Sequence, residues 1–424
     1  MQNREDILPA AFRRSLVSTA STNVGDGILL VCWAWTASLL TRDAILIAAV
    51  PFTVRVGWLG FAVFAGVIAD RFNRKRLIMA ADVSRFLLLA AFSGLVCLKV
   101  PFGPPAVSGV GSVPVYSALV ISALVAGMLE VVRDNSMQTI LPSIVRSSSL
   151  EKANGRNWAA ELLCNSLVGP MLGGAMLLWA PYMPFAVAGL LYAIGAAAFL
   201  RVRGAFTLKR RQSTWWQDIR EAAGFLLSHD FLPKLAAVAG AWNLFFLMAL
   251  TALILHVQEN LGGSSFDYSS VLAIGALGGA VGGWFGNRIV ATLGPGRTAQ
   301  YALLFSTPSF LCMAVAPDTW SLALVYFLFN FSGLVWNTVS VSFRQRALPD
   351  RMRGRINSLY RLSAWALMPV GILGCGLIVT VAEDSVGRSL AIALPFYVSA
   401  AGVFLVSVMT WPALGRGLEP RPGC

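Results

Sequence analysis

Residues 116–128 read Tyr-Ser-Ala-Leu-Val-Ile-Ser-Ala-Leu-Val-Ala-Gly-Met, an apolar run without a charged side chain. Comparable runs occupy residues 28–40 and 86–98. Each lies in a stretch of about twenty residues, the length that a helix needs to cross roughly 30 Å of hydrocarbon. The runs are continuous rather than alternating, and lipid admits only helices or closed barrels. The pattern therefore predicts transmembrane helices.

The composition of the whole chain agrees with this prediction. Of its 424 residues, 57% are hydrophobic and 12% are charged, whereas a soluble domain carries about 25% charged residues. Most of the outer surface therefore faces lipid, and the fold class that we expect is an all-α membrane protein with twelve transmembrane helices. The expected spans lie near residues 14–40, 44–69, 75–98, 115–138, 155–179, 184–202, 232–257, 268–290, 298–316, 320–344, 355–381 and 388–411.

The net charge of +13 follows the expected topology. With the N-terminus in the cytoplasm, only Arg42, Lys99 and Arg388 of the basic residues fall on the opposite side, and four more lie inside spans. This asymmetry is the positive-inside rule. It predicts a multi-pass protein of the inner (plasma) membrane with both termini cytoplasmic, whose basic residues face the lipid bilayer and cytoplasm rather than nucleic acid.

The chain contains an internal repeat. Residues 66–71, Gly-Val-Ile-Ala-Asp-Arg, follow the second span, and residues 283–288, Gly-Trp-Phe-Gly-Asn-Arg, follow the eighth. Gln-x-x-Leu-Pro likewise closes the fourth and tenth spans. We expect two six-helix bundles, residues 1–202 and 232–424, related by pseudo-two-fold symmetry. The cytoplasmic linker, residues 203–231, contains an amphipathic helix that lies either on the membrane surface or beneath the bundle.

The loop after the second span, residues 66–75 (Gly-Val-Ile-Ala-Asp-Arg-Phe-Asn-Arg-Lys), resembles the signature of the major facilitator superfamily. Asn73 stands where that signature has a Gly, and Asn is the residue that best replaces Gly in a left-handed turn. Residues 21–26, 82–85, 153–156 and 354–361 resemble the branch with macrolide-efflux and enterobactin-exporter proteins. Residues 135–138, Asn-Ser-Met-Gln, depart from this branch because they lack its usual basic residue.

The resemblance implies a conformational gate on the cytoplasmic side and a motif associated with export. Residues 169–174, Gly-Pro-Met-Leu-Gly-Gly, resemble the antiporter motif of the superfamily in the fifth span. Close packing of small residues without any directional meaning is the competing interpretation. The antiporter-motif residues are Gly169, Pro170, Gly173 and Gly174. The expected gate residues are Gly66, Asp70, Arg71, Arg74, Asp82, Arg85, Arg353 and Arg355.

Several ionisable residues fall inside the expected spans, where they are costly and usually functional. Asp26 and Arg55 each lie halfway along antiparallel spans, so we expect them to meet near the midplane. Low dielectric disfavours a charged carboxylate, which suits reversible proton binding. A static ion pair that only fixes helix packing is the alternative. The expected proton-coupling residues are Asp26, Glu161 and Glu130, and the expected core ion-pair residues are Arg55, Arg133 and Arg361.

Aromatic and amide side chains in the middle of spans are suited to binding a small amphipathic molecule. The chain has no nucleotide loop, and His229 and His256 are too far apart for a zinc motif. We therefore expect a proton-coupled exporter of a small-molecule substrate, with uptake as the alternative, and not an enzyme. We expect no cofactor, no metal site and a monomer. The candidate cavity residues are Trp33, Trp35, Trp242, Asn243, Asn330, Trp336 and Asn337.

Overall fold

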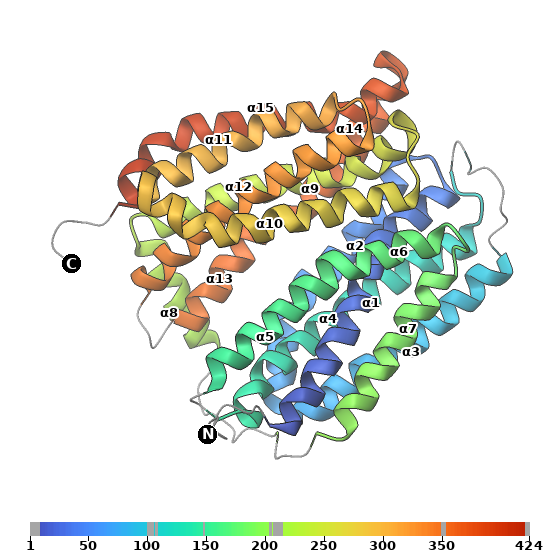
Figure 1. Ribbon diagram of the computed structural model, residues 1–424, viewed down its shortest axis with the longest axis horizontal. Helices are drawn as coiled ribbons and strands as arrows, with labels where there is room; N and C mark the ends of the chain where they lie inside the picture. Colours follow the sequence, from blue (N-terminus) through green and yellow to red (C-terminus); the bar gives the residue numbers. More distant parts are fainter. Residues whose placement is uncertain are drawn as a thin grey trace, which may run out of the picture. The chain divides into compact units, whose positions relative to one another are not determined.

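The computed structural model describes residues 9–99, 106, 109–146, 149–202, 206, 215–348 and 353–419. Within these ranges the chain forms helices and no strand, apart from an isolated β-bridge between Thr41 and Ala106 (Figure 1). This confirms the expected all-helical class.

Eleven helical segments in the described ranges are long and apolar enough to cross a membrane. They correspond to eleven of the twelve expected spans. The ninth expected span, 298–316, also forms a helix but is not among the eleven. Polar residues such as Thr298, Gln300 and Ser306 lower its hydropathy, and all three are buried within the protein.

The chain forms two compact units, which are described separately. The first unit comprises residues 1–210 together with residues 264–273, and the second comprises residues 211–263 and 274–424. The elements of the first unit are α1 (Ala10–Leu40), α2 (Ala44–Arg71), α3 (Arg74–Lys99), α4 (Val113–Ile144), α5 (Leu150–Leu163), η3 (Cys164–Val168), α6 (Gly169–Leu177) and α7 (Met183–Leu200).

The second unit contains the linker helix and the later spans. The first turns of α10, up to Ala273, belong to the first unit, and the rest of that helix belongs to the second. The elements are α8 (Trp215–Ser228), α9 (Leu232–Leu255), η4 (His256–Asn260), α10 (Ser265–Leu293), α11 (Pro295–Ala314), α12 (Thr319–Ala347), α13 (Arg353–Trp365), α14 (Met368–Val386) and α15 (Arg388–Gly417).

Side-chain caps fix where some of these helices begin. The carboxylate of Asp43 accepts hydrogen bonds from the backbone N–H groups of Ile45 and Leu46, at 2.9 and 3.3 Å, and so starts α2. Asp318 forms a capping box with Ser321 at the start of α12. Such caps satisfy backbone donors that the first helical turn leaves without partners.

The two units use the same pattern of helix neighbours. In the first unit α3 packs against α4 and α7, and α1 packs against α7; in the second, α11 packs against α12 and α15, and α9 packs against α15 (Figure 1). Thus α3 and α11 occupy the same place in the packing order of their units. This shared order agrees with the sequence repeat.

Glycines allow the closest helix crossings in both units. A Cβ atom on Gly57 of α2 would lie 2.6 Å from the carbonyl oxygen of Leu124 on α4. In α10, a Cβ on Gly278 or Gly282 would collide with the backbone of α12. Spacing glycines by four residues lets two helix backbones approach along one face. The glycine-rich run at residues 275–283 is therefore a helix-packing surface, as its sequence indicates.

The linker helix α8 packs against the second unit. Ala222 and Leu226 are buried, and α8 contacts α13 and α9. Of the two interpretations of this amphipathic segment, these contacts favour a helix packed beneath the bundle. The side chains of Trp215, Trp216 and Ile219 lie outside the described residues.

Candidate functional site

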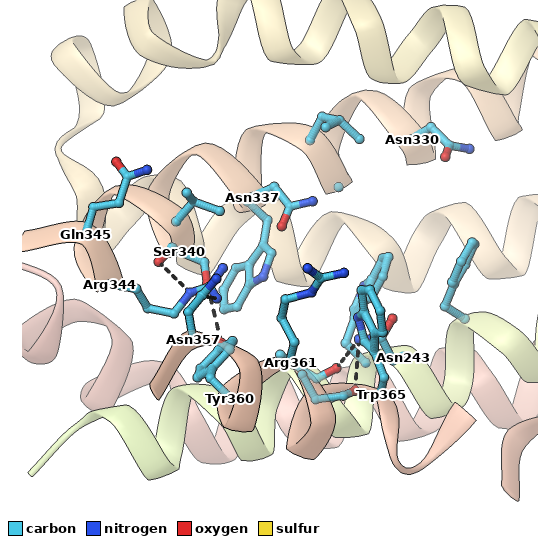
Figure 2. Close-up of a pocket in the computed structure, with 18 of the residues that line it drawn as sticks. Asn243, Asn330, Asn337, Ser340, Arg344, Gln345, Asn357, Tyr360, Arg361 and Trp365 are labelled. Atoms are coloured by element: carbon cyan, nitrogen blue, oxygen red, sulfur yellow. Dashed lines mark hydrogen bonds between the residues drawn. The ribbon is translucent and has the colours of Figure 1, made fainter. Parts of the chain in front are cut away.

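A pocket of about 730 Å³ lies in the second unit between α9, α12 and α13 (Figure 2). The volume suits a small organic molecule. Five of the candidate cavity residues line this pocket, and they come from two helices. These residues are Trp242 and Asn243 of α9, and Asn330, Trp336 and Asn337 of α12.

One wall of the pocket is aromatic. The ring of Trp242 stacks on Phe246 and Phe329, with centroid separations of 5.1 and 5.6 Å. Phe246 and Phe329 are themselves 5.6 Å apart. The indole Nε1 of Trp242 donates a hydrogen bond of 3.0 Å to the hydroxyl of Ser306 on α11, which fixes the plane of the ring. The wall therefore offers a preformed apolar surface to a flat ligand.

The opposite part of the pocket carries Arg344 of α12, which is buried. Its Nη1 donates to the amide oxygen of Asn357 on α13 at 2.5 Å, and its Nε donates to the backbone carbonyl of Ser340 at 3.3 Å. Its guanidinium carbon lies 4.1 Å from the centre of the Tyr360 ring. These contacts hold the guanidinium in place with neutral groups (Figure 2).

Arg361 of α13 contributes a second guanidinium to the pocket. Its guanidinium carbon lies 4.4 Å from the Trp365 ring centre. Figure 2 shows the side chain extending from α13 toward the amide of Asn337. Nearby, Asn243 donates to the backbone carbonyl of Ala364 at 3.1 Å, which ties α9 to α13.

The first unit contains a buried charged cluster instead. Asp26 of α1 forms an ion pair with Arg85 of α3 and accepts a 2.7 Å hydrogen bond from the hydroxyl of Tyr192 on α7. The guanidinium carbon of Arg85 lies 3.8 Å from the centre of the Tyr192 ring. The expected meeting of Asp26 with Arg55 is therefore wrong. The helix α2 packs against α4, where Arg55 interacts electrostatically with Glu130.

A second buried pair lies in the same unit. The Nε of Arg133 on α4 donates to Oδ1 of Asp82 on α3 at 2.9 Å, and its Nη2 lies 3.3 Å from the backbone carbonyl of Ser18. Arg133, which was expected to form an ion pair in the core, thus pairs with Asp82 inside the first unit. Asp82 and Arg85, which were expected in the cytoplasmic gate, are both buried inside the first unit, where their ion-pair partners lie. Their role in a gate stays a prediction.

Two basic residues at the start of α3 donate hydrogen bonds to backbone carbonyls of other segments. Arg74 donates to the backbone carbonyl of Thr139 on α4 at 2.8 Å. Lys75 donates to the carbonyls of Leu200 and Val202, at 2.7 and 2.8 Å, beyond the C-terminal end of α7. A cation at this end stabilises the helix dipole. The side chains of the remaining gate candidates, Gly66, Asp70, Arg71, Arg353 and Arg355, lie outside the described residues.

The antiporter-motif residues lie where α1 crosses η3 and α6. A Cβ atom on Gly169 would lie 2.6 Å from the Cα of Gly27, and one on Gly173 would lie 2.9 Å from the carbonyl oxygen of Ile28. The π-helical turn η3 ends directly before Gly169 and Pro170, so the missing N–H of Pro170 falls at a local widening of the helix. Gly174 faces Ser269 at the start of α10.

Comparison with known proteins identifies the family. Residues 24–372 match the sequence profile of the Major Facilitator Superfamily. The chain belongs to the Major Facilitator Superfamily. This facilitator is 26% identical over 402 residues to the multidrug efflux pump Tap of Mycobacterium tuberculosis (strain ATCC 25618 / H37Rv), which covers 90% of this chain and 89% of the relative. The family and its relatives are multi-pass membrane transporters, not enzymes.

A second group of relatives consists of enterobactin exporters. The facilitator is 24% identical over 363 residues to the enterobactin exporter EntS of Citrobacter koseri (strain ATCC BAA-895 / CDC 4225-83 / SGSC4696), covering 82% of this chain and 80% of the relative. Solved structures share the fold. A bacterial homologue of the iron transporter ferroportin matches with a TM-score of 0.72 at 16% identity, covering 96% of this chain and 98% of the other. The nucleoside transporter NupG (D323A mutant) matches with a TM-score of 0.74 at 11% identity, covering 96% and 100%.

The remaining candidates of the facilitator belong to the first unit. Glu130 of α4 is half-buried, and Glu161 of α5 is exposed. Trp33 was expected in a cavity, but it is buried against Phe92 and Phe185, with ring centroids 6.1 and 5.3 Å away. It belongs to the apolar interior of the first unit, as a large aromatic in mid-span commonly does.

Sequence reasoning missed several residues of both sites in this facilitator. Arg344 is the last residue of the expected tenth span, where the positive-inside rule already accounts for a basic residue. The sequence therefore offers no reason to place it in the pocket, which the structure shows it lines. Tyr192 lies midway along an expected span among small residues. A single tyrosine in the middle of a span was the only feature of the sequence that could have indicated its place in the charged cluster. Asn357 and Tyr360 lie in residues 354–361, which resemble a branch of the superfamily, and that resemblance was the available signal for these two side chains.

Proposed function

We propose that this facilitator is a secondary active exporter of a small amphipathic organic molecule. The pocket of the second unit carries the proposal, because it places aromatic rings, amides and guanidinium groups together within helices long enough to span a membrane. Polar groups in such a position are costly and usually serve a substrate. The export direction is supported by the efflux function of Tap, the export function of EntS and the antiporter motif at residues 169–174.

In this proposal, twelve transmembrane helices form two six-helix bundles related by a pseudo-two-fold axis, and the bundles alternate access to the substrate. The shared helix-neighbour order of the two units supports the symmetry. The distribution of Lys and Arg supports an inner-membrane protein with both termini in the cytoplasm. We propose a monomer.

Proton coupling is the second part of the proposal. The first unit gathers the carboxylates of Asp26, Glu130 and Asp134 around the guanidinium groups of Arg85 and Arg133. Protonation of a carboxylate weakens its ion pair, so proton uptake can change which helices are held together. We assign proton exchange to Asp26, Glu130 and Glu161.

Inverted membrane vesicles test the function. In these vesicles the cytoplasmic face points outward, so an exporter accumulates its substrate, and exchange for protons dissipates an imposed pH gradient. We expect at least one member of a panel of amphipathic organic anions and cations to collapse the gradient, followed with acridine orange, only when the facilitator is present.

Two outcomes would contradict the proposal. Accumulation in inverted vesicles that is unaffected by the pH gradient would exclude proton coupling. Accumulation only in right-side-out vesicles would replace export by uptake. Vesicles containing the Gly94→Ala variant serve as a matched control, because a Cβ at this position of α3 meets no atom within 4 Å and should leave transport unchanged.

A further inference from the structure

Three nearly parallel aromatic rings form one wall of the pocket in the second unit. Trp242 and Phe246 belong to α9, and Phe329 belongs to α12. The indole plane is inclined by only 16° to the ring of Phe246 and by 9° to that of Phe329. Phe329 is buried, whereas Trp242 and Phe246 are half-buried. Two aligned rings therefore remain partly uncovered at the surface of the pocket.

The orientation of Trp242 is set by a residue behind the wall. The hydroxyl of Ser306 on α11 accepts the 3.0 Å hydrogen bond from the indole Nε1, and Ser306 is buried. Ser306 is not among the described residues that line the pocket, so it acts on a ligand only through the ring. A Cβ atom at Gly333 of α12 would lie 3.8 Å from two indole atoms, so the missing side chain leaves room beside the ring. A ring that is already held in place loses little conformational entropy when a ligand stacks on it.

Asn243, the residue after Trp242, presents a hydrogen-bond acceptor to the same pocket. Its Nδ2 donates to the backbone carbonyls of Ala239 at 2.9 Å and of Ala364 at 3.1 Å. Both partners are acceptors, so the NH₂ group must lie on their side and the amide has one orientation. Its Oδ1 receives no hydrogen bond from another described residue. A polar atom within a membrane-spanning helix is costly to leave without a partner, so this oxygen is suited to an O–H or N–H group of a ligand.

The ring wall and the acceptor are held in a fixed relation. Trp242 and Asn243 are consecutive residues of α9, which is tied to α11 through Ser306 and to α13 through Ala364. A ligand that uses both features must therefore combine a flat ring with a hydrogen-bond donor close to that ring. The cavity of about 730 Å³ accepts a molecule with one or a few rings.

We propose that the pocket selects flat aromatic molecules that carry a hydrogen-bond donor, a hydroxyl or N–H group, on the ring. The ring stacks on Trp242, the donor binds Oδ1 of Asn243, and Ser306 is a positioning residue for the indole. This substrate class rests on the proposed function, because it names what the same site would carry. Saturated molecules of the same size, and aromatic molecules without a donor, each lose one of the two contacts.

Calorimetric titration of the full-length protein in nanodiscs tests the proposal, with empty nanodiscs titrated in parallel to subtract partitioning into lipid. Three probes share one fused skeleton and are uncharged at neutral pH. In 2-naphthol the rings are flat and carry a donor, in decahydro-2-naphthol the same hydroxyl stands on saturated rings, and in 2-fluoronaphthalene the flat rings lack a donor. We expect 2-naphthol to bind about fivefold more tightly than either of the others, the factor typical of one aromatic pair or one neutral hydrogen bond.

Variants assign each preference to its residue. Trp242→Leu should abolish the preference for 2-naphthol over decahydro-2-naphthol and keep the preference over 2-fluoronaphthalene. Asn243→Leu should do the reverse. The preference that each variant keeps reports that its pocket is folded. Trp242→Phe retains a ring and should retain most of the preference for flat rings.

Ser306→Ala tests the positioning role. Without its hydrogen bond the indole is less well ordered, so the preference for flat rings should fall about twofold while the preference for a donor stays. Ser309→Ala on the same helix is the matched control. Ser309 is also buried, but its hydroxyl donates to the backbone carbonyl of Phe305 at 2.8 Å, so neither preference should change.

Three results would overturn the substrate class. These are undetectable binding of 2-naphthol, binding no tighter than that of either other probe, and a preference that survives the substitution of its assigned residue. An unchanged preference for flat rings in Ser306→Ala would refute the positioning role. The titrations require no pH gradient, so the two proposals fail separately. Export of other molecules by vesicles, with no binding of 2-naphthol, would overturn the substrate class alone, and the expected binding pattern without transport would overturn the function alone.

Discussion

The Nε atom of Arg133 lies 2.9 Å from Oδ1 of Asp82, and the two side chains are only 2% and 0% exposed. The pair joins α4 to α3 inside the first unit. The same guanidinium also faces Asp134 at 3.7 Å, but that carboxylate is 41% exposed. One arginine thus makes a buried ion pair and a solvent-accessible one. Removing the buried carboxylate of Asp82 leaves a buried guanidinium without its paired anion, which is costly. Removing the more exposed carboxylate of Asp134 costs little, because water solvates the charge there.

Asp82→Asn should destabilise the protein strongly. The substitution leaves Arg133 as a buried cation without its paired anion, which costs about 3–5 kcal/mol. Reversible unfolding of the detergent-solubilised protein measures the change. Asp134→Asn is the matched control on the same guanidinium, and its cost should stay below about 1 kcal/mol. Equal losses in the two variants would show that burial does not set the strength of these pairs.

Gly169→Ala should disrupt the crossing of α1 with η3 and α6. The added methyl would lie 2.6 Å from the Cα of Gly27. A backbone atom cannot move aside to relieve this clash as the end of a flexible side chain can. Such overpacking costs about 1–3 kcal/mol, and the helices must separate to accommodate it. Melting temperature and transport in vesicles should both fall. Gly155→Ala meets no atom within 4 Å and should leave the melting temperature unchanged or slightly higher. A normal Gly169→Ala protein would refute the close approach.

Lys75→Gln should weaken the C-terminal end of α7. The ammonium group donates to the carbonyl of Leu200, the last residue of α7, and to that of Val202 just beyond it. A cation at a helix C-terminus contributes about 0.3–1 kcal/mol. Hydrogen exchange at the last turn of α7 should therefore accelerate several-fold. Arg76→Gln removes a charge from the exposed neighbouring position and should leave that exchange unaltered; matching acceleration in both variants would point to general charge loss.

The cap of α12 should respond to acid. Backbone hydrogen bonds from Ser321 and Trp320 hold the pKa of the Asp318 carboxyl below its ordinary value. Because the folded-state pKa is depressed, the capping contribution is present at neutral pH and is lost as the pH falls through that lowered pKa. Exchange protection of the first turn of α12 should drop in that acidic range. Asp318→Asn retains a capping oxygen without titrating, so its protection should be independent of pH. A parallel drop in Asp318→Asn would exclude the carboxyl as the cause.

The helices were predictable from sequence, and most side-chain pairings were not. Continuous apolar runs specify spanning helices because lipid requires internally satisfied backbone. Five of the seven cavity candidates line the pocket. Amide side chains in mid-span are costly in lipid, so they tend to face a cavity, and aromatic rings often accompany them there. Trp33 fails this rule because a large aromatic ring packs equally well in an apolar interior. The amino-acid type alone does not separate these two environments.

Which residues form an ion pair depends on which helices pack side by side, and a single sequence does not predict that packing well. Asp26 and Arg55 lie at similar depths in consecutive spans, so depth alone predicted their contact. The packing of α1 beside α7, and of α7 beside α3, brings Arg85 to Asp26 instead. Arg344 illustrates the same limit. Its position at the expected cytoplasmic end of a span agrees with the positive-inside rule, and the sequence gives no sign that it also lines a pocket.

Asp26 and Arg85 allow proton transfer to be separated from packing. Asp26→Asn leaves the buried Arg85 without its ion-pair partner, so the single variant should lose both stability and proton-driven transport. In the double variant Asp26→Asn/Arg85→Gln neither charge remains, and most of the stability should return. If Asp26 carries the proton, this double variant should still fail to use a pH gradient, while substrate exchange across vesicles without a gradient continues. Proton-driven transport at the wild-type rate in the double variant would instead show that Asp26 only holds α1 against α3.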